Sequence, residues 1–97
     1  MVGIASFASH DVERFFIDGH APRRAGWRNV ADVAARKLDM IRYAETLSDL
    51  RSPPGNRLEA LSGSLAGDHS IRINDRWRIV FRWTDRGAES VRIVDYH

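Results

Sequence analysis

The 97-residue sequence predicts an α+β fold, in which a short N-terminal strand and two helices precede a three- to four-stranded antiparallel meander, with the helices packed on one sheet face. Two observations predict it. In the first half of the chain, apolar residues recur at steps of three and four, which is the period of an amphipathic helix. After the breaker RSPPGN at residues 51–56 the period becomes two, which is typical of strands.

The first half is expected to hold one strand and two helices. Residues 2–8 (VGIASFA) read as a short strand, after which Ser9 can cap a short helix that Gly19 ends. Residues 20–26 form a loop, and a longer helix is expected from residue 27 to about residue 47. The apolar stripe of that helix is expected to contain Trp27, Val30, Ala34, Leu38 and Ile41.

The second half is expected to form the meander. Residues 57–63 are a possible strand, and residues 69–74, 77–83 and 89–96 are better ones because apolar and polar residues alternate along them. The turn sequences NDR and TDRG separate the last three strands closely enough for antiparallel hairpins. The sequence has no internal repeat and no second set of elements, so residues 1–97 are expected to form a single domain.

The register of the first hairpin follows from the requirement that one sheet face be buried. A two-residue loop would pair Arg72 with Trp77 and mix charged with apolar side chains on one face. A three-residue loop instead pairs Ile71 with Ile79 and Arg72 with Arg78, which keeps the two kinds of side chain on opposite faces. The second register is therefore predicted, and it places the Arg78 side chain in solvent.

The sheet face opposite the core is expected to be rich in arginine. Arg72 and Arg78 become cross-strand neighbours, and they repel each other unless an anion sits between them. By alternation, Arg82 and, on the last strand, Arg92 and Tyr96 join the same face. This pattern fits either an anion-binding surface or a solvated polar face over which arginine side chains extend.

Composition narrows the partners and the chemistry. Fourteen of the fifteen basic residues are arginine, whose planar fork suits phosphate, although a GC-rich genome also explains much of the excess. The chain has no cysteine, and His10, His20 and His69 lack ligand spacing, so no metal or other cofactor is expected. No apolar stretch of membrane-spanning length and no signal-peptide pattern occurs, so a cytoplasmic protein without membrane contact is expected.

The closing residues Asp95, Tyr96 and His97 supply side-chain types that metal-independent RNA cleavage needs. A base removes the proton of a ribose 2′-hydroxyl, which attacks the adjacent phosphorus, while an acid protonates the departing 5′ oxygen. Cations stabilise the added negative charge, an aromatic ring stacks on a nucleobase, and histidine titrates near neutral pH. The alternative is structural: His97 frays, Tyr96 covers the sheet edge and Asp95 pairs with an arginine.

Three segments carry a resemblance to a known family: PPGNRLEALSG (53–63), HSIRINDRWRIVFRW (69–83) and VDYH (94–97). They are similar to the HigB-like toxins of bacterial toxin–antitoxin systems, within the RelE/ParE superfamily, and most of all to the subgroup called GraT. The resemblance implies a RelE-like fold and a ribosome-dependent endoribonuclease that cuts translated messenger RNA. The partners it implies are a helix-turn-helix antitoxin similar to HigA or GraA, the ribosome and messenger RNA, with operator DNA reached only through the antitoxin complex.

The resemblance also assigns residues. Asp95, Tyr96 and His97 match the closing Asp-Tyr-His of the family, to which catalysis and base stacking are attributed. Asn74 matches the asparagine of the hairpin turn, and Arg78 matches an arginine suited to clamp phosphate. Together with the arginine-rich face, this places the expected RNA contacts at Arg72, Asn74, Arg76, Arg82 and Arg92.

Residues 59 and 62 depart from the family. Many HigB proteins have a histidine and a lysine where this chain has Glu59 and Ser62. Glu59 is a candidate base for the 2′-hydroxyl, with His97 as the acid; alternatively, Glu59 pairs with an arginine and Asp95 or His97 is the base. The loss of a lysine beside the phosphate weakens charge stabilisation, so slow catalysis is expected.

Two other classes of function remain open. One is a non-catalytic toxin of the same fold, such as a ParE-like gyrase inhibitor, which needs no acid–base set; the closing triplet therefore favours the ribonuclease. The other is a toxin that acts mainly as a co-repressor with its antitoxin. A net charge of only +2 disfavours strong DNA binding by the chain alone.

Overall fold

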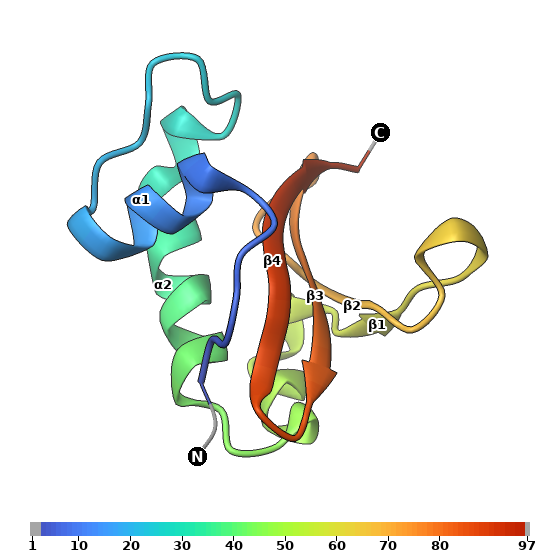
Figure 1. Ribbon diagram of the computed structural model, residues 1–97. Coiled ribbons are helices and arrows are strands. Elements are labelled where there is room, and N and C mark those ends of the chain that lie inside the picture. Colours follow the sequence, from blue (N-terminus) through green and yellow to red (C-terminus); the bar gives the residue numbers. More distant parts are fainter. Residues whose placement is uncertain (1–2, 97) are drawn as a thin grey trace.

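The computed structural model describes residues 3–96, which form two α-helices, four short 3₁₀-helices and one four-stranded sheet (Figure 1). The α-helices are α1 (His10–Asp18) and α2 (Ala31–Tyr43). The 3₁₀-helices are η1 (Arg28–Val30), η2 (Leu47–Arg51), η3 (Pro54–Asn56) and η4 (Gly63–Leu65). The strands are β1 (Glu59–Ala60), β2 (His69–Arg72), β3 (Trp77–Thr84) and β4 (Gly87–Asp95). All strand pairs are antiparallel and follow chain order, which confirms the predicted α+β meander.

Local sequence explains where α1 begins and ends. The Ser9 hydroxyl accepts a hydrogen bond from the Val12 N–H at 3.3 Å, which caps the first turn. Gly19 adopts the left-handed conformation, with a φ of 75°, and its N–H donates to the Phe15 carbonyl. Both predicted ends of this helix are confirmed.

The longer predicted helix is wrong at both ends. The helix α2 begins only after η1, and it ends at Tyr43 because Ala44 adopts an extended conformation. A separate 3₁₀-helix, η2, then begins at a capping box formed by Thr46 and Asp49. The capping box satisfies backbone N–H groups that a continuing helix would have bonded to its own carbonyls, so the chain starts a new helix there.

The strand predicted at residues 2–8 is replaced by two isolated bridges. Ile4 pairs with Ala88 and Phe7 pairs with Val91, both parallel to β4. Residues 1 and 2 lie outside the described residues. The N-terminal segment therefore runs beside β4 without forming a continuous ladder with it.

A bulge in β4 explains this interruption. Between the pairs Val80–Arg92 and Arg82–Glu89, β4 contains one residue more than β3. Ser90 lies in this stretch with a φ of 55°, and its N–H bonds to a serine hydroxyl of the N-terminal segment instead of a carbonyl. Simple alternation of faces therefore describes only the part of β4 that follows Ser90.

The first hairpin has the register that the burial argument predicts. Ile71 pairs with Ile79, and Arg72 pairs with Arg78. The isoleucines are fully buried against the helices, which confirms that this face of the sheet belongs to the core.

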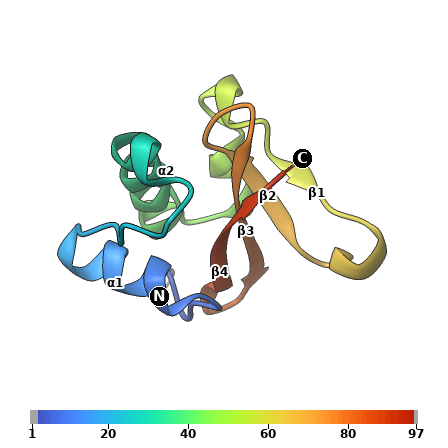
Figure 2. The ribbon, with the colours of Figure 1, turned by 90° about the horizontal axis from the view of Figure 1, so that it is seen from above.

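The hydrophobic core lies between the helices and one face of the sheet (Figures 1 and 2). Fully buried side chains come from α2 (Ala34, Leu38, Ile41) and from the sheet (Ile71, Ile79, Phe81, Val91). On the other side of the sheet, away from the helices, residues 61–68 project as a loop between β1 and β2 (Figure 1). The helices thus cover only one face of the sheet, and the other face is available for a functional site.

Candidate functional site

A cleft of about 510 Å³ is lined by residues of β1, β3 and β4 and of the loop that follows β1. Four residues predicted for the site take part in its lining: Glu59, Arg92, Asp95 and Tyr96. A cavity of this size accommodates a small organic ligand such as a nucleotide. The cleft is therefore the place where these four predicted residues meet.

Arg78, Glu59 and Tyr96 form a connected group beside the cleft, which we call the Arg78 cluster. Arg78 Nη1 donates to Glu59 Oε1 at 2.6 Å, and the Tyr96 hydroxyl donates to the same oxygen at 3.0 Å. Arg78 Nη2 donates to the Arg57 carbonyl at 2.7 Å. The guanidinium carbon lies 4.7 Å from the centre of the Tyr96 ring, which is a cation–π contact.

The prediction that Arg78 faces solvent is wrong. The residue is only 6% exposed, because the Tyr96 ring covers its guanidinium and Glu59 and a backbone carbonyl engage its terminal nitrogens. Its Nε is buried and has no hydrogen-bond partner within residues 3–96. The Glu59 side chain, in contrast, keeps 45% of its surface exposed. The cluster thus encloses a cation while its carboxylate and its phenol remain accessible.

Carboxylates of the chain itself relieve the predicted repulsion between Arg72 and Arg78. Arg72 forms an ion pair with Asp75, and Arg78 forms one with Glu59. Each arginine therefore has its own negative partner, and the sheet needs no bound anion between the two.

The end of β4 is tied to the β2–β3 turn. Arg76 Nε donates to Asp95 Oδ2 at 2.9 Å, and the Tyr96 N–H donates to the Arg76 carbonyl at 2.6 Å. The Asn74 side-chain oxygen accepts hydrogen bonds from the N–H groups of Arg76 and Trp77, at 2.9 and 2.8 Å. Asn74 thus shapes the turn, and through Arg76 the turn positions Asp95 and Tyr96.

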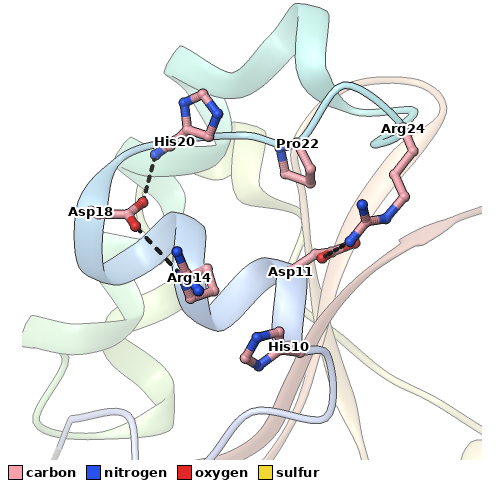
Figure 3. Close-up of a pocket in the computed structure, with 7 residues that line it drawn as sticks. All are labelled: His10, Asp11, Arg14, Asp18, His20, Pro22 and Arg24. Carbon is pink, nitrogen blue, oxygen red and sulfur yellow. Dashed lines mark hydrogen bonds and ion pairs between the residues drawn. The ribbon is translucent and has the colours of Figure 1, made fainter.

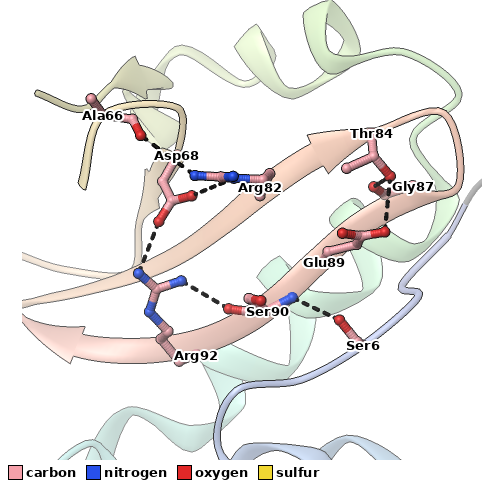
Figure 4. Close-up of polar contacts among 9 residues, drawn as sticks. All are labelled: Ser6, Ala66, Asp68, Arg82, Thr84, Gly87, Glu89, Ser90 and Arg92. Atoms are coloured by element: carbon pink, nitrogen blue, oxygen red, sulfur yellow. Dashed lines mark hydrogen bonds and ion pairs between the residues drawn. The ribbon is translucent and has the colours of Figure 1, made fainter. Parts of the chain in front are cut away.

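A second group, which we call the Asp68 cluster, joins Asp68, Arg82 and Arg92 (Figure 4). Asp68 Oδ1 accepts from Arg82 Nε at 3.2 Å, and Oδ2 accepts from Arg92 Nη2 at 2.9 Å. Burial, the largest single influence, raises the pKa of Asp68, but the hydrogen bonds and charges of Arg92 and Arg82 together lower this pKa below its usual value. At 7% exposure, Asp68 is the enclosed member of its group.

Asp68 was missed by sequence reasoning. It precedes β2 in a turn region, where an acidic residue is usually solvated. No local pattern marks Asp68, because its partners Arg82 and Arg92 lie 14 and 24 positions further along the chain.

The other predicted residues are placed as follows. Arg92 lines the cleft, whereas Arg72, Asn74, Arg76 and Arg82 are not among its lining residues. His97 lies outside the described residues, so its role as acid or base stays a prediction.

A second hollow, of about 260 Å³, lies between α1 and the loop at residues 20–26 (Figure 3). Its two arginines are paired: Arg24 with Asp11 at 2.7 Å, and Arg14 with Asp18 at 3.6 Å. Among its described lining residues this hollow has no tyrosine, phenylalanine or tryptophan, whereas in the cleft Tyr96 stands beside a carboxylate and a cation. We therefore place the candidate site in the cleft.

Residues 3–96 contain neither a cluster of metal-ligating side chains nor a helix able to span a membrane. Within this range no group of three or more histidine, aspartate or glutamate side chains is arranged to hold a metal ion. No helix in the same range combines the length and the apolar character needed to cross a bilayer, and the longer α-helix, α2, has 13 residues.

Comparisons with known proteins agree with this architecture. Residues 5–97 match the family described as the RelE-like toxin of the type II toxin–antitoxin system HigB. Toxin HigB-1 of Vibrio cholerae is 40% identical over 74 residues, which span 76% of this chain and 77% of that protein. An uncharacterized protein of Haemophilus influenzae is 46% identical over 63 residues, which span 65% of this chain and 62% of that protein. The crystal structure of YafQ from E. coli has a TM-score of 0.56 at 17% identity, covering 99% of this chain and 94% of that one, a likeness of fold alone.

Proposed function

We propose that this chain, which belongs to the HigB-like family of RelE-like toxins, is a ribosome-dependent endoribonuclease that cuts messenger RNA and so inhibits translation and growth. The observation that carries the enzymatic part of the proposal is the convergence of Glu59, Arg78 and Tyr96 beside one cleft. They supply a carboxylate, an enclosed cation and an aromatic ring, which are groups that acid–base cleavage of RNA uses.

Glu59 is the proposed base. Its Oε1 is engaged by Arg78 and Tyr96, whereas its Oε2 makes no hydrogen bond within residues 3–96 and can accept the proton of a ribose 2′-hydroxyl. The 2′ oxygen then bonds to phosphorus, and the bond from phosphorus to the 5′ oxygen breaks, which leaves a 2′,3′-cyclic phosphate. His97 is the proposed acid that protonates the departing 5′ oxygen, and Asp95, held by Arg76, keeps the chain end in place.

Arg78 is proposed to stabilise the negative charge that builds up on the phosphate oxygens. Because the Tyr96 ring covers the guanidinium, the ring has to move away when RNA binds, and it then stacks on a nucleobase. Arg92 lines the cleft itself. The remaining proposed RNA contacts, which extend the surface around it, are Arg72, Asn74, Arg76 and Arg82.

The partners follow from the family and from the reaction. Membership of a toxin–antitoxin family implies an antitoxin, which we propose to be a helix-turn-helix protein similar to HigA or GraA. The ribosome presents the message, so the reaction belongs in the cytoplasm, and operator DNA is contacted only through the antitoxin complex.

The test is primer extension on a translated message after the chain is induced in cells. Cuts are expected in the unaltered chain, and they should disappear when translation is blocked beforehand. Glu59→Gln and deletion of His97 should abolish the cuts, whereas Glu13→Gln, the same change on the exposed first turn of α1, should not. Intact messages together with stalled DNA replication would identify a ParE-like gyrase inhibitor instead.

A further inference from the structure

The part of the cleft formed by the loop at residues 61–68 differs chemically from the Arg78 cluster. Leu61 and Leu65 line it together with Val80 and Val94. The Leu65 side chain remains 39% exposed although it is large and apolar. A phosphate gains nothing from such a surface, whereas the flat, weakly polar face of a nucleobase gains by covering it.

The loop also contributes one polar side chain to the lining of the cleft. Ser62 lines the cleft, and no hydrogen bond within residues 3–96 engages its hydroxyl. A hydroxyl both donates and accepts, so it can bond to the edge of a base that covers the leucines. An apolar wall with one uncommitted hydroxyl is a surface suited to reading a base.

Hydrogen bonds close the loop at its base and join that base to the sheet. Its ends are joined by a hydrogen bond from the Leu61 N–H to the Asp68 carbonyl at 2.9 Å, and the Asp68 N–H donates to the Leu65 carbonyl at 3.0 Å. The Asp68 side chain then bonds to Arg82 of β3 and Arg92 of β4 (Figure 4). A site on a supported loop keeps its shape before the ligand arrives, which lowers the entropy lost on binding.

We propose that residues 61–65 form a nucleobase subsite for an RNA nucleotide next to the scissile phosphate. Leu65 is its apolar contact, Ser62 is its hydrogen-bonding group, and Asp68 is the positioning residue that holds both in place. The inference rests on the proposed ribonuclease function and adds to it a determinant of which base lies beside the cut, separate from stacking on Tyr96.

The test compares Leu65→Ser and Ser62→Ala with the unaltered chain in a translating extract, where fragment ends are sequenced and cleavage is measured against message concentration. Leu65→Ser is expected to raise the message concentration for half-maximal cleavage about tenfold with little change in the maximal rate. Ser62→Ala is expected to weaken the base preference at one position beside the cut. Ile17→Ser is the matched control, because Ile17 is 71% exposed and does not line the cleft.

Further variants separate a positioning role from a general effect on folding. Leu65→Met keeps the apolar contact and should restore the half-saturating concentration, whatever the stability of Leu65→Ser. Asp68→Asn should shift half-saturation in the same direction as Leu65→Ser, and Asp68→Glu should recover part of the loss. Cleavage by the unaltered chain with unchanged half-saturation and base preference in both loop variants overturns the subsite alone. No cleavage by the unaltered chain overturns the proposed function and the subsite with it.

Discussion

The Arg78 cluster and the Asp68 cluster both contain arginine–carboxylate ion pairs, but they differ in which member of the pair is buried. In the Arg78 cluster the cation is enclosed and its carboxylate partner, Glu59, is exposed. In the Asp68 cluster the carboxylate is enclosed, and Arg82, one of its two partners, is exposed. Both lie on the sheet face away from the helices, so the difference comes from which partner the surrounding chain covers.

This difference fits the proposed catalytic role of the Arg78 cluster and a structural role of the Asp68 cluster. Both oxygens of Asp68 are bonded to arginines, so its charge is satisfied and its geometry is set. Glu59 has one oxygen engaged, and Arg78 has an Nε without a partner within residues 3–96. Unsatisfied groups with an exposed partner can exchange contacts with a substrate, which is what the proposed catalysis at the Arg78 cluster requires.

The largest expected effect is that of Arg78→Ala. The substitution removes the enclosed cation, so cleavage should fall by about 10²- to 10³-fold, the usual cost of losing one charge-stabilising donor. Because Arg78 bonds to Glu59 and to the Arg57 carbonyl from a buried position, the free energy of unfolding should also fall by about 1–3 kcal/mol. Single-turnover cleavage and denaturant unfolding measure the two effects. An unchanged free energy of unfolding would contradict the buried position of Arg78 and support the solvent-facing one that alternation predicted.

Asp68→Ala should have the second-largest effect, and mainly on stability. It leaves Arg82 and Arg92 near each other without their shared acceptor, so the free energy of unfolding should fall by about 1–3 kcal/mol. Denaturant unfolding measures this loss. If the maximal cleavage rate of Asp68→Ala fell as far as that of Arg78→Ala, the structural role of the Asp68 cluster would be contradicted.

Acid should weaken the Asp68 cluster. The pKa of Asp68 lies below its usual value in the folded chain, so its contribution to stability is present above the unfolded pKa of about 4 and is lost as the pH falls through the folded pKa. Asp68→Asn should therefore flatten the fall of the unfolding free energy below about pH 4. Hydrogen bonds from the N–H groups of Thr46 and Glu45 also lower the pKa of Asp49, so Asp49→Asn should flatten the same curve without changing cleavage. An identical acid curve for Asp68→Asn and the unaltered chain would contradict the ion-pair geometry.

Tyr96→Phe should have the smallest effect. It removes the hydroxyl that bonds to Glu59 but keeps the ring over Arg78, so the unfolding free energy should change by no more than about 1 kcal/mol. Cleavage should change only a few-fold, whereas Tyr96→Ala, which also removes the stacking ring, should reduce it further. Equal losses for the two variants, measured in parallel single-turnover assays, would assign the role to the hydroxyl instead of the ring.

Particular elements show how far sequence reasoning reached. The ends of α1 were predictable because Ser9 and Gly19 act through bonds to residues three or four positions away. The Arg72–Arg78 pairing was predictable because one buried face permits only one register. The end of α2 was not, since the capping box of η2 competes with a helical pattern that continues past Tyr43. The bulge at Ser90 was not, because no residue there marks a break in the alternation.

The sequence by itself determined the class of fold, the apolar face of the sheet and the family, because periodicity and motifs are written in neighbouring residues. The tertiary structure alone decided that Tyr96 covers Arg78, that Glu59 bridges them, and that Asp68 anchors the loop at residues 61–68. These contacts join residues 14 to 37 positions apart, from the Asp68–Arg82 pair to the Tyr96–Glu59 pair. Burial and the pKa of a carboxylate depend on what such distant segments bring together, and no local pattern encodes that.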